Sequence, residues 1–174
     1  MNPRFNWLRS PRLLGLSGLI SIAFLSGAFY LQFFENEAPC PLCILQRYAY
    51  ILIALFALTG ASVRQRRLNL ALHGFTLIAT IGGIVAAARQ IWVLKHPFFS
   101  CGFDIFRPIV DNLPLAWILP SAFTASRLCE VPYAPILGLS LPTWSLIGYL
   151  SIFALVSVSL ISSCKLGSAA KSSL

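Results

Sequence analysis

Leu13–Phe34 reads LLGLSGLISIAFLSGAFYLQFF, which is 22 residues without a charged side chain. About 20 apolar residues are enough for a helix to cross the hydrocarbon layer of a membrane, so this stretch predicts a transmembrane helix. A cleaved signal peptide is the alternative, because the preceding residues are basic and Ser26-Gly27-Ala28 resembles a cleavage site. The apolar run is longer than the hydrophobic region of a signal peptide and continues past that site, which favours the membrane helix.

Three more uncharged stretches follow, at residues 48–63, 68–88 and 131–164. The first of these is short, so its helix is expected to begin near Ile44, whereas prolines delay the start of the last helix to about Trp144. We predict one domain over residues 1–174, an all-α membrane protein with a four-transmembrane-helix bundle. The composition agrees, since 57% of residues are hydrophobic and only 10% are charged. The predicted helices cover about residues 13–34, 44–63, 68–88 and 144–161.

The net charge of +8 is typical of nucleic-acid binding at first sight, but its distribution indicates membrane orientation instead. The two tails and the turn around Arg64–Arg67 carry eight basic residues and no acidic one. All five acidic residues and the other five basic residues lie on the opposite side. The positive-inside rule therefore predicts cytoplasmic N and C termini, a short first periplasmic loop at about 35–43 and a long second one at about 89–143. We expect no nucleic-acid partner.

Four of the five cysteines fall in the two predicted outer loops. Cys40 and Cys43 lie in the first loop, Cys101 and Cys129 lie in the second, and Cys164 is at the cytoplasmic end of the last helix. Because disulfides persist outside the cytoplasm, two disulfides are the natural interpretation. A four-cysteine zinc site is the rival, but only one pair has the chelating Cys-x-x-Cys spacing, so we predict no metal.

The motif Cys40-Pro41-Leu42-Cys43 leads directly into the second predicted helix. Pro41 suits the first helical position, and a helix N-terminus favours a thiolate on neighbouring cysteines. A disulfide between these cysteines closes too short a loop to add much stability, so a redox role is favoured over a structural one. Cys101 and Cys129 enclose 27 residues, and a disulfide between them contributes roughly 3–4 kcal/mol in the loop-entropy model, so a structural disulfide remains an alternative there.

Arg47 follows Cys43 by one helical turn, so the two side chains share a helix face. A guanidinium at that position favours the Cys43 thiolate and can hold a carbonyl or anionic oxygen of a ligand. The alternative is an arginine whose side chain extends to the lipid headgroups. A dithiol at the membrane boundary beside an arginine indicates an electron acceptor that resides in the bilayer, and a quinone is the obvious candidate.

The sequence resembles the disulfide bond formation protein B (DsbB) family of the bacterial inner membrane over roughly Leu13–Ile161. Two cysteine pairs in the outer loops of a four-helix chain make the resemblance specific. The matching motifs are Cys40-Pro-Leu-Cys43-Ile-Leu-Gln-Arg47, Pro97-Phe-Phe-Ser-Cys101, Leu113-Pro-Leu115, Cys129-Glu130 and Gly138-Leu-Ser-Leu-Pro-Thr-Trp144-Ser-Leu.

The resemblance implies an oxidoreductase that reoxidises a periplasmic thioredoxin-fold partner, DsbA, and passes the electrons to the membrane quinone pool and the respiratory chain. Cys101 would be joined to the partner in a mixed disulfide, and Cys129 would exchange with Cys40. Cys43 would then reduce ubiquinone or menaquinone, whose head Arg47 would bind.

Several residues depart from the family pattern or have no role in it. Gln46 stands where the best-known member has an acidic residue, and Arg89 lies near the place of a family histidine, which makes it a candidate second quinone contact. We expect Cys164 to be a small apolar packing residue or a free cytoplasmic thiol, and His73 to be a structural residue. We expect His96 and Glu130 to be solvated residues on the surface of the outer loop.

Two other functions remain open at this stage. A paralogous enzyme that runs in the other direction, as a quinone-reducing or isomerase-supplying protein, would serve a different partner. A non-catalytic tetraspan protein would use the outer cysteines as structural disulfides, but it has no need of Cys-Pro-Leu-Cys at the bilayer boundary with Arg47 one turn on.

Overall fold

The computed structural model describes residues 3–35, 37–96, 103–129 and 135–171, and in them the chain forms four long and three short helices. The long helices each contain a segment long and apolar enough to cross a membrane. The predicted four-helix membrane bundle is therefore confirmed, and the chain is a multi-pass membrane protein. The long helices are α1 (Pro3–Phe34), α2 (Pro41–Ser62), α3 (Arg66–Lys95) and α7 (Leu141–Lys171). The short helices are α4 (Phe103–Asp111), α5 (Pro114–Ile118) and α6 (Pro120–Phe123).

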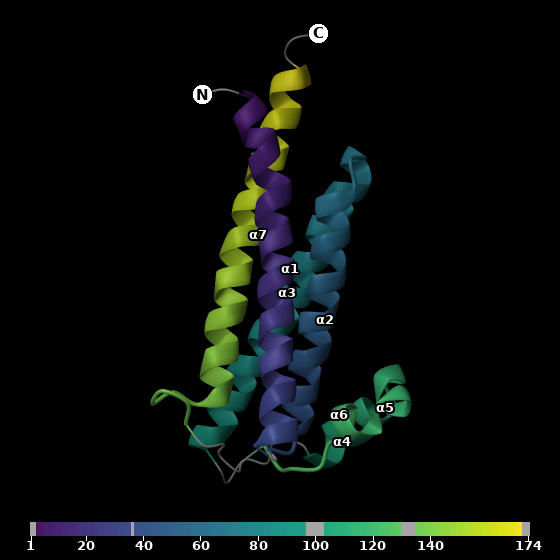
Figure 1. Cartoon of the computed structure of the whole chain (residues 1–174), viewed down its shortest axis with the longest axis vertical. Coiled ribbons are helices and arrows are strands. Elements are labelled where there is room, and N and C mark those ends of the chain that lie inside the picture. Colours follow the sequence, from purple (N-terminus) through teal and green to yellow (C-terminus); the bar gives the residue numbers. More distant parts are fainter. Residues whose placement is uncertain (1–2, 36, 97–102, 130–134, 172–174) are drawn as a thin grey trace.

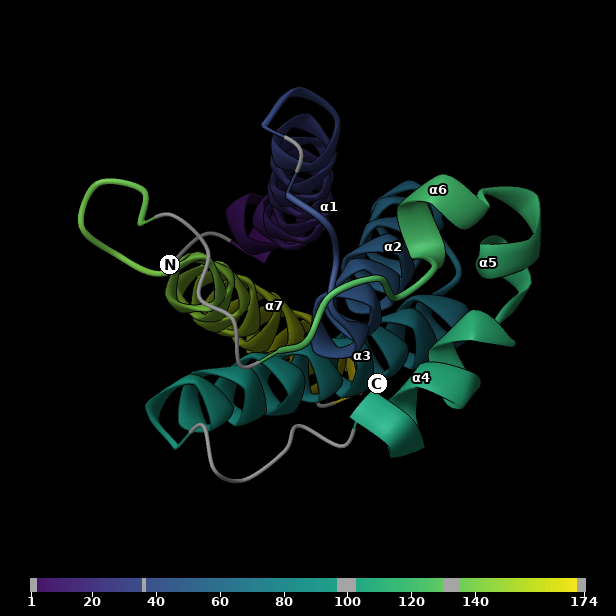
Figure 2. The same cartoon turned by 90° about the horizontal axis from the view of Figure 1, so that it is seen from below.

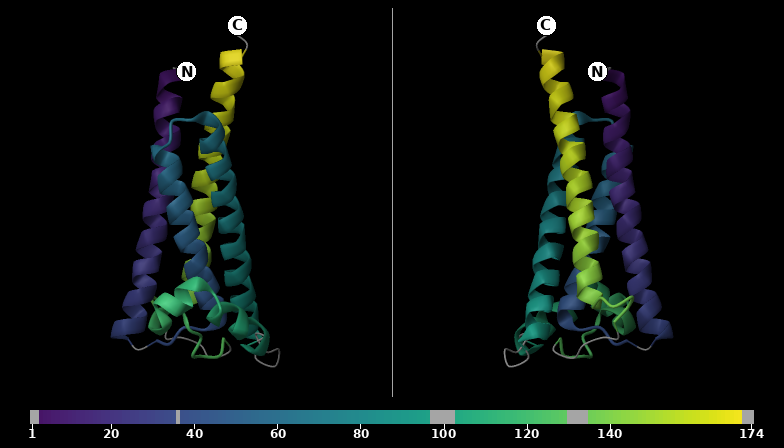
Figure 3. Two further views of the ribbon diagram at one scale, coloured as in Figure 1. Left: turned by 90° about the vertical axis from the view of Figure 1, so that its right-hand side faces the viewer. Right: turned by 90° about the vertical axis from the view of Figure 1, so that its left-hand side faces the viewer.

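The four long helices run side by side, each against two neighbours (Figure 1). α1 packs on α2 and α7, and α3 closes the ring by packing on the same two helices. Seen along the bundle, α1 and α3 therefore lie on opposite sides of it (Figure 2). α1 begins, α2 turns into α3, and α7 ends at one end of the bundle, which we call the termini end (Figure 3). The α1–α2 connection and the short helices lie at the opposite end, which we call the cysteine end.

All four long helices extend beyond the uncharged stretches of the sequence. α1 begins at Pro3 and not near residue 13, and α7 covers Leu141–Lys171 and not only 144–161, because helical backbone hydrogen bonding continues through the charged residues that flank the apolar core. α2 begins at Pro41, in the first turn, where the missing N–H of proline leaves no hydrogen bond unmade. Cys40 caps this helix, because its Sγ accepts a hydrogen bond from the Cys43 N–H at 3.3 Å. α3 continues through Arg89 to Lys95, since backbone hydrogen bonding does not stop at the first charged side chain. The cysteine motif therefore lies on the first turn of α2.

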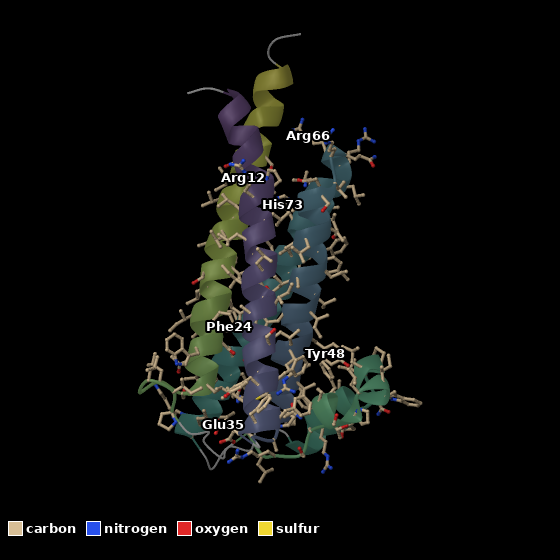
Figure 4. The ribbon with its side chains drawn as sticks, viewed as in Figure 1. Arg12, Phe24, Glu35, Tyr48, Arg66 and His73 are labelled. Carbon is tan, nitrogen blue, oxygen red and sulfur yellow. The ribbon has the colours of Figure 1, made fainter. Side chains whose placement is uncertain are left out.

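A column of aromatic rings joins three of the long helices. Phe24 of α1 stacks on Tyr50 of α2 at 5.5 Å between ring centroids, and Tyr50 stacks on Tyr149 of α7 at 4.2 Å. Tyr149 packs directly on Gly83 of α3, where any larger side chain would meet its ring. Small residues commonly allow such close approach between membrane helices. The column fixes the spacing of the bundle next to the cysteine end, on the side toward the middle of the bundle (Figure 4).

The short helices pack against the cysteine end of α2 (Figure 1). Phe123 of α6 contacts the rings of Phe29 and Tyr48, and the Tyr48 hydroxyl accepts a hydrogen bond from the Leu115 N–H at 3.0 Å. Pro114 and Pro120 each open a new helix, so the apolar segment 113–123 forms two short helices. Its placement along the membrane interface stays a prediction.

Charged residues mark the two ends of the bundle. Arg12 and Arg66 lie at the termini end and Glu35 lies at the cysteine end (Figure 4). Glu37 and Arg127 form an ion pair that joins the α1–α2 connection to the segment after α6. His73 lies inside the bundle, where its ring contacts the Ser159 hydroxyl at 2.9 Å and so links α3 to α7.

Candidate functional site

Three cysteine side chains meet at the N-terminus of α2. The Cys40 and Cys43 sulfurs lie 2.8 Å apart, so the pair can form a disulfide with little movement of the backbone. Cys129 reaches the same place from the segment after α6, and its side chain forms a hydrogen bond with Cys40. Backbone contacts hold that segment in position, because the Ser126 N–H donates to the Pro39 carbonyl at 3.1 Å. Cys40 is therefore the central sulfur, with Cys43 on one side and Cys129 on the other.

The environment of Cys40 opposes ionisation of its thiol. Its side chain is 0% exposed and packs with Leu42, Val93 and the 1% exposed Cys129. Burial raises the pKa of the Cys40 thiol well above its ordinary value, and the neighbouring thiols of Cys129 and Cys43 add to the shift. The sequence indicated a thiolate favoured by the helix N-terminus; at Cys40 the loss of water outweighs that effect. Cys40 is therefore a poor nucleophile, whereas within a disulfide it remains open to attack by a neighbouring sulfur.

A buried glutamine contacts both sulfurs of the Cys-x-x-Cys motif. The Gln90 Nε2 group of α3 donates toward Cys43 Sγ at 3.1 Å and lies 3.4 Å from Cys40 Sγ. The Oε1 atom of Gln90 accepts a hydrogen bond from Gln46 Nε2 at 2.7 Å. Sequence reasoning did not identify Gln90 as a site residue. The available signal was a strongly polar residue close to a membrane span, which is a reason to suspect function.

Arg47 is 5% exposed and points into the protein, which does not fit a side chain that extends to lipid headgroups. Its Nη1 donates to Gln32 Oε1 and to the Ala122 carbonyl, each at 2.5 Å, and Nη2 donates to the Ala28 carbonyl at 3.4 Å. The guanidinium also lies 5.2 Å from the centre of the Phe29 ring. Arg47 thus joins α1 to α6 beside the cysteine motif. Gln32, a strongly polar residue within the first apolar stretch, is one of its partners.

A small cavity opens beside Cys43 between α1, α2 and the start of α7. Its wall is partly aromatic and apolar, and its polar groups come from α2, α3, Glu37 of the α1–α2 connection and Ser145 of α7. The predicted residues Cys43 and Arg47 both line it. Residues that line it include Phe24, Cys43, Gln46, Arg47, Tyr50 and Gln90.

The other predicted site residues lie elsewhere. Cys101 and Glu130 are outside the described residues. Arg89 is exposed, packs over the Trp92 ring at 4.7 Å and is not among the residues that line the cavity, so its role as a quinone contact stays a prediction. Within the described ranges, no group of three or more His, Cys, Asp or Glu side chains is arranged to hold a metal ion.

Comparison with known proteins places this site in a family. The family model described as "Disulfide bond formation protein DsbB" matches residues 10–159. This chain belongs to the DsbB family. The resemblance seen in the sequence is therefore confirmed.

Individual DsbB relatives agree over most of their length. "Disulfide bond formation protein B 1" of Pseudomonas syringae pv. syringae is 48% identical over 148 residues, which are 85% of this chain and 88% of the relative. "Disulfide bond formation protein B" of Burkholderia thailandensis is 45% identical over 153 residues, covering 88% and 90%. Membership of the DsbB family supports a role in disulfide bond formation as an oxidoreductase, and the three clustered thiols are the groups that such chemistry requires.

Proposed function

We propose that this chain reoxidises a DsbA-like thioredoxin-fold oxidase in the periplasm and passes the electrons to a membrane quinone, either ubiquinone or menaquinone. The observation that carries the proposal is the central position of Cys40. Its sulfur contacts Cys43 on one side and Cys129 on the other, which is the order that electron transfer by thiol–disulfide exchange requires.

In the proposed sequence, the partner's thiolate attacks Cys101 of a Cys101–Cys129 disulfide and releases Cys129 as a thiolate. Cys129 then attacks Cys40 of the Cys40–Cys43 disulfide. That step forms the Cys129–Cys40 bond, breaks the Cys40–Cys43 bond and leaves the electron pair on Cys43. Burial of Cys40 suits this order, because Cys40 acts here only as the sulfur that is attacked.

The lining of the cavity fits a quinone head. Phe24 and Tyr50 offer flat rings, and the Arg47 guanidinium and the Gln90 amide offer donors for a quinone oxygen. A bound quinone supplies the acceptor for the two electrons and two protons that oxidation of a dithiol releases. Cys43, which also lines the cavity, is the cysteine placed to reach it.

The charge distribution supports the proposed location in the bacterial inner membrane. Described basic residues such as Arg12 and Arg66 lie at the termini end, and the positive-inside rule assigns that end to the cytoplasm (Figure 4). The cysteine end then faces the periplasm, where a soluble partner meets it and disulfides persist. In this orientation the whole chain is one DsbB-like domain with its chemistry at the outer surface of the membrane.

The test is a turnover assay with the purified protein, a reduced DsbA-like partner and either ubiquinone or menaquinone. We expect catalytic oxidation of the partner with one quinone reduced per disulfide formed. Cys43→Ser is expected to abolish quinone reduction. Cys101→Ser is expected to block capture of the partner while the Cys40–Cys43 disulfide still forms.

Two results would contradict this proposal. If the Cys43→Ser protein reduced quinone at the wild-type rate, Cys43 could not be the residue that passes electrons to the quinone. A mixed disulfide between the partner and Cys129, trapped in place of one with Cys101, would reverse the assigned order of the outer cysteines.

A further inference from the structure

We propose that the Gln90 side chain, held by Gln46, is a positioning residue that stabilises Cys43 as a thiolate when the Cys40–Cys43 disulfide opens. The inference rests on the proposed function, because opening of that disulfide is a step of the proposed exchange. It adds a group that neither the family motifs nor the cysteine spacing identified.

The orientation of the Gln90 amide follows from its partner. Gln46 donates from Nε2 to Gln90 Oε1 at 2.7 Å, so the oxygen end of the Gln90 amide is already engaged. The NH₂ end therefore faces the sulfurs, at 3.1 Å from Cys43 and 3.4 Å from Cys40. An amide NH₂ has two hydrogens and a thiolate has none, so donation toward the sulfur is the direction that matches both groups.

Burial strengthens this hydrogen bond at the moment when charge appears. Gln90 is 1% exposed and Gln46 is 5% exposed, so the amide pair is shielded from water. The α2 backbone at Gln46 is also fixed, since its carbonyl accepts a hydrogen bond from the Tyr149 hydroxyl at 2.8 Å. A donor that is already in place stabilises a developing anion without having to reorient.

Gln90 acts in the exchange step in which Cys129 attacks the Cys40–Cys43 disulfide. This step replaces one disulfide by another, so the protein undergoes no net oxidation or reduction in it. As Cys129 bonds to Cys40, the Cys40–Cys43 bond breaks and both of its electrons stay on the Cys43 sulfur. The described hydrogen bonds of Arg47 run to α1 and α6, whereas Gln90 donates to the sulfur itself. Gln90 thus makes Cys43 a better leaving group and holds its thiolate beside the cavity.

The experiment measures Cys43 alone, without quinone or partner. The background is the full chain with the other four cysteines changed to serine. Gln90→Met removes the donors at similar length, Gln90→Glu keeps the shape but replaces the donors by acceptors, and Gln46→Met removes the anchor of the amide. Gln65→Met is the matched control, because Gln65 is an exposed glutamine at the opposite end of α3, in the N-cap position, and its side chain makes no capping hydrogen bond. The readouts are the rate of Cys43 alkylation by iodoacetamide near neutral pH and the thiolate absorbance in the ultraviolet.

We expect Gln90→Met to lower the alkylation rate about tenfold, which is the effect of losing one hydrogen bond to a charged group. Gln90→Glu is expected to lower it further at a pH where the new carboxyl is ionised, because a carboxylate cannot donate and repels the thiolate. Gln46→Met is expected to have a smaller effect of the same sign, and Gln65→Met none. The rate at a pH where Cys43 is fully ionised controls for accessibility, and we expect it to stay the same in all variants.

A Gln90→Glu protein that alkylates at the wild-type rate at a pH where its carboxyl is ionised would overturn the inference, since it would show that only the shape of the side chain matters. Equal rates in Gln90→Met and wild type would do the same, with thermal unfolding used to show that both are folded. The proposed function fails by a different result, namely the absence of quinone-coupled partner oxidation by the wild-type protein. The two failures are therefore distinguishable.

Discussion

Gly83→Ala tests whether the aromatic column sets the geometry of the bundle. A Cβ atom at position 83 would lie 2.3 Å from Cε1 of Tyr149 and 2.4 Å from its Cζ, well inside ordinary contact distance. The Tyr149 ring cannot easily give way, because it is fully buried, stacks on Tyr50 at 4.2 Å and donates to the Gln46 carbonyl. The clash is therefore expected to push α3 and α7 apart.

The magnitude follows from two opposing effects. Overpacking a well-packed interior typically costs about 1–3 kcal/mol, and a clash against a pinned ring belongs near the upper end. Replacing glycine by alanine inside a helix returns roughly 1 kcal/mol. We expect a net loss of about 2 kcal/mol in the free energy of unfolding. Gly82→Ala is the matched control, since a Cβ atom at position 82 has no atom within 4 Å of it.

The assay compares the unfolding of the two variants in the same detergent, together with quinone-coupled partner oxidation. Gly82→Ala is expected to be as stable as the wild type or slightly more so. Gly83→Ala is expected to unfold more easily and to lose activity, because Tyr149 contacts the backbone of Gln46 beside the site. The reasoning is refuted if both variants are equally stable and active. Tyr149→Leu in the Gly83→Ala protein should restore part of the stability by removing the ring.

Two further predictions concern the site. Arg47→Lys is expected to raise the apparent quinone KM about tenfold with less change in kcat, because one ammonium group cannot replace the guanidinium that bonds to both α1 and α6. Steady-state kinetics measure both constants. An unchanged KM would leave Arg47 only a structural role. In the reduced protein, iodoacetamide near pH 7 is expected to modify Cys43 at least about tenfold faster than Cys40, because burial raises the pKa of Cys40 and keeps it protonated. Since a thiol ionises as pH increases, the difference should shrink toward alkaline pH; peptide mass spectrometry measures both rates, and equal modification near pH 7 would contradict the assignment.

Hydrophobic length was sufficient to predict the bundle. A membrane helix must satisfy its backbone hydrogen bonds internally, so about 20 apolar residues specify one with little help from the rest of the chain. The position of Pro41 in the first turn of α2 was predictable for a similar reason, because the preference of proline for that position follows from local backbone geometry. Both predictions depend on neighbouring residues only.

The meeting of Cys129 with Cys40 could not be predicted from spacing. It depends on short helices that pack on α2 through Phe123 and on loop contacts such as Ala125 N–H with Asp111 Oδ1 at 3.0 Å. These contacts join residues far apart in the chain, and no periodic pattern encodes them. The sequence allowed a disulfide between Cys101 and Cys129; the position of Cys129 against Cys40 is a property of the folded loop.

The end of α3 shows why hydropathy located the span but missed the donor to the sulfurs. The uncharged stretch ends at Ala88, so Arg89 and the residues after it were assigned to a loop. The helix continues to Lys95, and a helix turns about 100° per residue, so neighbours face different directions. Arg89 consequently lies on the exposed face over Trp92, while Gln90 faces the cysteines. The charged residue Arg89 therefore marked where the apolar stretch ends. The side chain that contacts the sulfurs belongs to the next residue, the uncharged Gln90. Its direction follows only from the continuation of α3 as a helix past Arg89.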